Sequence, residues 1–321
     1  MALHAQLPPC PMLSEPRLRD AQALLLSGDP RRAADRCAHL LGGAPHAGTP
    51  GWQAAFGALR AESLLCLGDA GWAEREAAAA VRAAPPGGAL VLWPAAVLAQ
   101  TLTETGRYEE ADRQLRDAAR GPLPSTAYAL PYLRARGRHR LAVRRPAEAL
   151  ADFRRTGGGV NRPDAGLFLH LPWRTDAAEA LLGLGRCRQA AELVREQLAR
   201  TAVLGPRYRG VALRLLAATE EPARRPATLA RAIVELRACA DRPELARALA
   251  DLGDCLHDLG DDFTAGGVLR RARHLAADCG APPLPARVLP GTVRPARYRA
   301  GTSPRRLPAA PRDDRPAASG V

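Results

Sequence analysis

The chain has 321 residues, a formal net charge of +13 at pH 7 and no lysine, so arginine supplies every strongly basic side chain. The missing lysine excludes Schiff-base catalysis, a Walker-A phosphate loop and a kinase-type lysine in this chain. Hydrophobic residues make up 47% of the chain, and most of them are alanine or leucine; there is one isoleucine (Ile233), and aromatic residues make up 4%. This composition favours helices over strands.

The arginine excess has a simple explanation, because GC-rich codons encode arginine, alanine, glycine and proline. A basic chain could also attract nucleic acid. We favour the interpretation that most of the arginines are ion-paired or lie on solvated helix faces.

Neither export nor a membrane location is indicated. Residues 1–9 lack the basic segment and apolar core of a signal peptide, and no apolar run approaches the ~20 residues of a membrane span. The seven cysteines are scattered and form no Cys-x-x-Cys motif, which is typical of a reduced protein. We therefore expect a soluble, cytoplasmic protein that begins with a flexible segment, residues 1–13.

A sequence pattern is repeated along the chain. Its clearest copy lies between Leu98 and Ala118, where apolar or small residues recur at three- and four-residue steps on both sides of Gly106. This pattern predicts two amphipathic helices joined by a tight turn, with Gly106 in the left-handed conformation that ends the first helix. In chain order, the turns of successive copies are predicted at Gly28, Gly68, Gly106, Arg144, Gly185 and Gly260.

The spacing of these turns defines the predicted architecture. The steps are 40, 38, 38, 41 and 75 residues, and the last leaves room for one eroded hairpin around residues 220–222. The repeated pattern resembles the tetratricopeptide repeat, whose Gly-x-Tyr-x-x-Ala turn matches Gly106, Tyr108 and Ala111. The repeats in this chain are longer than the usual 34 residues. We predict an all-α, tetratricopeptide-like solenoid of about seven helical hairpins over residues 14–281, with a concave binding surface. An irregular helical bundle is the alternative.

Glycine and proline mark the predicted breaks. Residues 84–88, 121–125 and 157–163 are predicted loops, and the glycine run at 157–159 could divide the solenoid into two sub-stacks. Residues 282–321 are rich in proline and arginine, so we expect a disordered tail.

Two segments carry a more particular resemblance. Residues 171–186 read Leu-Pro-Trp-Arg-Thr-Asp-Ala-Ala-Glu-Ala-Leu-Leu-Gly-Leu-Gly-Arg, and residues 243–253 lead on to Ala-Ala-Asp-Cys-Gly-Ala at 276–281. Over about 165–281 the chain resembles the helical-repeat region of large ATP-binding LuxR-type regulators of actinobacteria, relatives of the maltose regulator. The resemblance implies a signal-sensing or protein-interaction module in transcriptional control, with a protein partner or small-molecule inducer in the solenoid groove.

The chain also departs from that family. It has no Walker-A loop, and its Pro/Arg-rich end shows no helix-turn-helix pattern. We expect a truncated or split regulator whose reading frame was lost near Pro282, and no sequence-specific DNA binding by this chain alone. A stand-alone tetratricopeptide-like adaptor or scaffold is the alternative function.

No candidate catalytic, cofactor or metal site emerges. Cys255 and His257 are two residues apart and would point to different helix faces, which argues against zinc. The glycine run follows no strand and precedes no lysine, and no Gly-x-Ser-x-Gly motif occurs. Asp261 and Asp262 fit helix capping better than catalysis. We therefore predict a protein that is not an enzyme and needs no cofactor or metal.

The candidate contact residues are aromatic or arginine side chains, the types that anchor interfaces. Packing between hairpins is the alternative role for each aromatic residue. The arginine cluster at 134–145 could contact an acidic partner or a phosphate backbone. The predicted contacts are Trp93, Tyr128, Tyr132, Arg134, Arg138, Trp173 and Arg174.

Overall fold

The computed structural model describes residues 11–43, 49–200 and 205–282. Within these ranges the chain is helical and contains no strand, which confirms the predicted all-α fold. Residues 1–10 of the predicted N-terminal segment lie outside the described ranges, whereas residues 11–14 form a short 3₁₀ helix, η1 (Pro11–Ser14). The predicted tail, apart from Pro282, also lies outside them.

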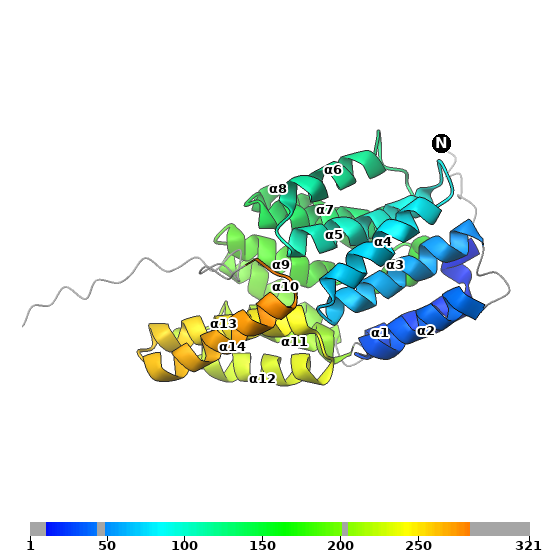
Figure 1. Cartoon of the computed structure of the whole chain (residues 1–321). Coiled ribbons are helices and arrows are strands. Elements are labelled where there is room, and N and C mark those ends of the chain that lie inside the picture. The colour runs from blue at the N-terminus through cyan, green and yellow to red at the C-terminus, as the bar shows by residue number, and fades with distance from the viewer. Residues whose placement is uncertain (1–10, 44–48, 201–204, 283–321) are drawn as a thin grey trace, which may run out of the picture.

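Within the described ranges, consecutive helices pair into seven antiparallel hairpins (Figure 1). The pairs are α1 (Pro16–Leu26) with α2 (Pro30–Gly43), α3 (Pro50–Cys66) with α4 (Ala70–Ala83), α5 (Leu92–Glu104) with α6 (Tyr108–Ala118), α7 (Ala129–Ala142) with α8 (Pro146–Val160), α9 (Trp173–Gly183) with α10 (Cys187–Arg200), α11 (Pro206–Ala217) with α12 (Arg225–Ala238), and α13 (Arg242–Asp258) with α14 (Asp262–Asp278). Short 3₁₀ helices precede α5, α9 and α12: η2 (Ala89–Val91), η3 (Pro163–His170) and η4 (Pro222–Arg224). None of the described helices has the length and apolar character needed to cross a bilayer.

The predicted turn residues end the first helix of their hairpins. At the α5–α6 turn, the amide of Gly106 donates to Thr103 O at 3.1 Å and that of Arg107 to Leu102 O at 2.8 Å, a Schellman pair of hydrogen bonds. All six predicted positions have left-handed backbones: Gly28 (φ 95°), Gly68 (81°), Gly106 (77°), Arg144 (63°), Gly185 (73°) and Gly260 (88°). The eroded α11–α12 hairpin instead turns through η4, where the sequence predicted it.

The row of hairpins closes on itself. Figure 1 shows the hairpin of α1 and α2 meeting the hairpin of α11 and α12 end to end, although three or more hairpins separate them in sequence. A β carbon added at Gly28 would lie 2.9 Å from Cγ of Pro206, and one at Gly68 would lie 2.5 Å from Sγ of Cys279. Helix α13 likewise packs against α3. The first helices of the hairpins therefore enclose an interior where an open solenoid would present a groove.

The glycine run was wrongly predicted as a loop. Residues 157–160 form the last turn of α8. A β carbon at Gly157 would lie 2.6 Å from the Trp173 indole, and one at Gly159 would lie 2.2 Å from Cδ2 of Leu130. Glycine therefore serves close helix packing here, and the buried contacts offset its low helix propensity. The other two predicted loops, 84–88 and 121–125, are non-helical as expected.

The glycine run offers a matched test of this packing. Gly157→Ala should lower the free energy of unfolding by about 1–3 kcal/mol, because its β carbon would overlap a rigid indole. Gly158→Ala should raise it by about 0.5–1 kcal/mol, because a β carbon there meets nothing within 4 Å and alanine favours helix. Urea unfolding followed by circular dichroism measures both, and equal effects would contradict the packing role.

Candidate ligand-binding site

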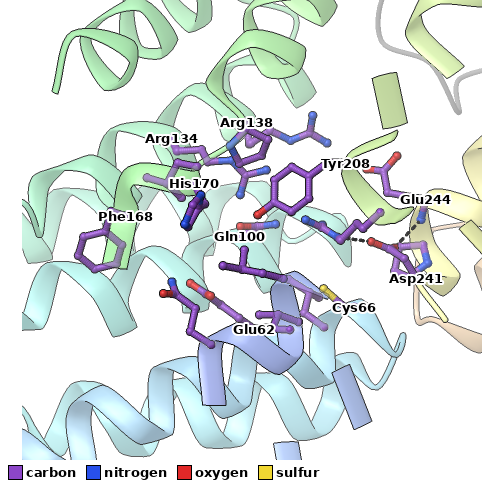
Figure 2. A pocket seen from close by; sticks show the side chains of 18 of the residues that line it. Glu62, Cys66, Gln100, Arg134, Arg138, Phe168, His170, Tyr208, Asp241 and Glu244 are labelled. Carbon is purple, nitrogen blue, oxygen red and sulfur yellow. Dashed lines mark hydrogen bonds and ion pairs between the residues drawn. The ribbon is translucent and has the colours of Figure 1, made fainter. Parts of the chain in front are cut away.

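The interior holds two adjoining cavities. The first has a volume of about 100 Å³ and is lined from α1, α3, α5, α7, η3, α11 and α13, as Figure 2 shows from close by. The second has about 230 Å³, and its apolar lining comes from α3, α7, α13, α14 and the segment that follows α14. Leu65, Glu104, Arg138, Pro243 and Arg247 line both cavities, so they form the partition between them.

Buried ion pairs surround this partition, and we call them the central ion-pair cluster. Nε of Arg134 lies 2.6 Å from Oδ2 of Asp176, and Nη1 of Arg247 lies 2.6 Å from Oε1 of Glu244. Arg247 also contacts Glu104 across the closure between α13 and α5. The members of the cluster are Glu104, Arg134, Arg138, Asp176, Glu179, Arg214, Glu244, Arg247 and Asp251.

Arg214 is the most buried member, with 1% of its surface exposed. Its guanidinium lies 3.7 Å from Glu179, 3.4 Å from Glu244 and 3.4 Å from Asp251. A buried charge of this kind is tolerated only where opposite charges replace the lost hydration. Because the three carboxylates come from α9 and α13, Arg214 on α11 ties three hairpins together.

The first cavity also contains polar groups that no described residue satisfies. Oε1 of Glu62 accepts a hydrogen bond from the Trp93 indole at 2.8 Å, which leaves Oε2 without a protein partner among the described residues. The Gln100 amide, the His170 ring and the Tyr208 hydroxyl also line the cavity without a protein hydrogen bond from the described part of the chain. Figure 2 shows the Tyr208 hydroxyl pointing toward the Gln100 side chain. Tyr208 is itself only 8% exposed.

Burial shifts the pKa values of several groups in this cavity. Burial raises the pKa of Tyr208 to about 12 and that of the Cys66 thiol to about 12, so both stay protonated at neutral pH. Burial lowers the pKa of His170, which keeps its ring neutral. Burial also raises the pKa of Glu62, against the smaller lowering effects of Trp93 and Arg134. The cavity therefore offers hydrogen-bond donors and acceptors, whereas a thiolate nucleophile is disfavoured.

Two predicted contact residues reach this site. Arg134 and Arg138 line the first cavity, although both are engaged by carboxylates of α9. Trp93 is buried and reaches the site only through its bond to Glu62. Tyr128 packs edge-on against Phe168 at 5.9 Å between ring centroids, and the Tyr132 hydroxyl donates to Leu115 O at 2.9 Å.

Trp173 and Arg174 lie elsewhere, at the contact of α8, α9 and α10. The Arg174 guanidinium stacks 4.5 Å from the Trp173 ring centroid, and its Nε lies 3.5 Å from Oε2 of Glu196. Neither residue lines the two interior cavities.

The rest of the 134–145 arginine cluster is mostly paired within the fold. Arg136 and Arg140 both bind Asp152, at 2.7 Å and 2.6 Å, while Arg145 pairs with Glu148. Ion pairing is therefore the role of most of this cluster.

The weaker candidate sites have structural roles. Asp261 caps α14, because its side chain accepts a hydrogen bond from the Thr264 amide at 3.1 Å. Cys255 is buried with its sulfur 3.8 Å from Pro222 O, while His257 pairs with Asp262. The described residues contain no group of His, Cys, Asp and Glu suited to a metal ion.

Sequence reasoning missed Glu62, Gln100, His170 and Tyr208. They stand on four separate elements, and no local motif connects them. The sequence signal that could have indicated them is their position on the first helices of the hairpins or, for His170, on the segment that leads into α9. Closure of the solenoid is what brings them to one cavity.

No protein-family model and no curated protein matches the chain. Among solved structures, the chain is similar to BtubC (BKLC) from P. vanneervenii, with a TM-score of 0.41 and 16% sequence identity. The alignment covers 68% of this chain and 93% of that one.

Removal of the Arg214 guanidinium should strongly destabilise the fold. Arg214→Met removes the guanidinium that Glu179, Glu244 and the protonated Asp251 share, so we expect a loss of about 3–5 kcal/mol in the free energy of unfolding. The control is Arg116→Met, whose side chain is 66% exposed and should cost less than about 1 kcal/mol. Chemical denaturation of both variants measures the difference, and similar losses would rule out a central role for Arg214.

Asp251 should make stability depend on pH. Burial, only partly offset by Arg214, raises the pKa of Asp251 from 3.8 to about 8. Between these values the folded chain holds a proton that the unfolded chain releases, so the free energy of unfolding falls as pH rises from about 4 to 8. Asp251→Asn should flatten this slope in urea titrations at pH 5 and 8, while the exposed Asp20→Asn should not. An unchanged slope in Asp251→Asn would contradict the assignment.

Proposed function

We propose that this chain is a signal-sensing, helical-repeat module of a LuxR-type transcriptional regulator, and that it binds a small-molecule inducer in the first interior cavity. One observation carries the proposal: four polar side chains from separate elements converge on that cavity and find no protein partner for at least one polar atom each. Tyr208 is buried, and Glu62, Gln100 and His170 are half-buried. Polar groups withdrawn from bulk solvent normally find a hydrogen-bond partner, so this set supports a ligand or ordered water in the cavity.

The size of the interior favours a small molecule over a protein segment. The two cavities, of about 100 and 230 Å³, are smaller than typical pockets for drug-sized ligands, which range over about 300–1,000 Å³. A peptide helix is about 10–12 Å wide with its side chains and does not fit. Of the two kinds of occupant expected for the groove, the small-molecule inducer is the one we retain.

The regulator assignment is supported by the positions, in the structure, of the two segments that resemble LuxR-type regulators. The 171–186 segment supplies Asp176 and Glu179, and the 243–253 segment supplies Glu244, Arg247 and Asp251. The residues that carry the resemblance are therefore those that hold the closed interior together. A ligand that touches both α3 and α11 would stabilise this closure, which is a physical route from binding to signalling. The proposed location is the cytoplasm.

A stand-alone adaptor is the second candidate, and one surface feature favours it. At the tip of the last hairpin, Phe263 is 95% exposed and Leu259 is 47% exposed. Exposed apolar side chains of this size are common in protein contacts.

Ligand screening tests the sensing role. In a thermal-shift screen of small polar metabolites, at least one compound should raise the melting temperature of the purified chain. Tyr208→Phe should weaken that compound's binding about 3- to 10-fold, the equivalent of one lost hydrogen bond. Phe263→Ser should bind it normally. Absence of any binder, together with a defined protein partner lost in Phe263→Ser, would favour the adaptor.

Genetic context tests the regulator assignment separately. We expect a Walker-A domain in a neighbouring gene, or LuxR-type helices encoded in another frame beyond codon 282. Translation of the other two frames and of the adjacent genes checks this, and finding neither would leave the chain as a sensing module of another kind of protein.

A further inference from the structure

We propose that the first cavity takes a small organic cation, a primary amine held as an ammonium ion, with Glu62 as its counter-ion. This assignment rests on the proposed function, in which that cavity is the ligand site. It adds the chemical class of the ligand.

The arginines that line the cavity are already neutralised. Arg134 binds Asp176 at 2.6 Å, and Arg207 binds Asp241. Arg138 and Arg247 are shared among Glu104, Glu179 and Glu244. Most of these carboxylates are buried, and several hold two arginines or a backbone amide as well. An anionic ligand would have to compete with these fixed carboxylates for its partners.

Glu62 is the exception among the acids that line the cavity. Glu104, Asp241 and Glu244 each form an ion pair, whereas Glu62 forms none with any described residue. Its one hydrogen bond is donated by the neutral Trp93 indole at 2.8 Å. Glu62 is half-buried, and a carboxylate partly withdrawn from water is stabilised by gaining a proton or a cation.

The surrounding groups suit an ammonium ion. An ammonium group has three N–H donors and no acceptor. Oε2 of Glu62, the amide oxygen of Gln100 and the hydroxyl oxygen of Tyr208 are three acceptors on the cavity wall without a described protein donor. Leu25, Leu65 and Phe168 complete the lining with apolar surface that a short alkyl stem can cover. The modest volume of about 100 Å³ limits the ligand to a few heavy atoms beyond the nitrogen.

Calorimetry with matched probes tests the charge. The full chain is titrated with n-propylamine, with neutral 1-propanol and with propionate, which are similar in size and differ in charge. We expect binding of propylamine alone. Its affinity should fall as pH is lowered, because protonation of Glu62 removes the counter-ion.

Variants test the residue. Glu62→Gln keeps an oxygen for the Trp93 indole but loses the charge, so it should weaken propylamine binding at least 10-fold while the chain stays folded by circular dichroism. The control Glu221→Gln lies on the exposed surface and should bind propylamine as the unmodified chain does. Unchanged affinity in Glu62→Gln would overturn the assignment.

The outcomes separate this inference from the proposed function. If 1-propanol or propionate binds at least as well as propylamine, and Tyr208→Phe weakens that binding, then the cavity is a ligand site and the cation assignment is wrong. If no probe of any charge binds, and the metabolite screen also finds no binder, the inference and the sensing role both fail.

Discussion

The closed shape of this solenoid depends on charge burial at its centre. Arg214 is almost fully enclosed, and Glu179, Glu244 and Asp251 surround it at 3.4–3.7 Å. A guanidinium in that position cannot be deprotonated and must be compensated by acids fixed around it. Because those acids belong to α9 and α13, the packing of three hairpins is coupled to one charge. Arg247 extends the coupling to Glu104 on α5, across the closure.

Closure changes what a helical-repeat protein can bind. An open stack of hairpins presents an extended concave surface suited to a peptide or a helix. Here the first hairpin meets the sixth, and the second meets the seventh, so the corresponding surface becomes a pair of small cavities. The polar side chains that would have faced a groove now face one another. A ligand in this interior would touch both ends of the repeat array, and its binding would therefore be linked to the stability of the closure.

The repeat turns could be predicted from the sequence because each turn depends on residues that are close together in the chain. A helix that ends in a Schellman motif needs a left-handed residue at one position, and glycine meets that need wherever it recurs at a period near 40. Even Arg144 could be placed, since the spacing required a turn there. The glycine run at 157–159 was wrongly predicted as a loop because glycine also occurs where helices pack closely. The positions of Trp173 and Leu130 in the structure show that these glycines serve helix packing.

The amino-acid sequence was enough to establish the helical composition, the hairpin period and the abundance of arginine, because these follow from local propensity and from spacing along the chain. It also marked Arg134 and Arg138 as residues of interest. Only the tertiary structure shows which acids pair with the arginines of the 134–145 cluster, and that Glu62, Gln100, His170 and Tyr208 share one cavity. The physical reason is that contacts between hairpins far apart in sequence depend on the sum of small rotations between neighbours, and no local motif encodes that sum.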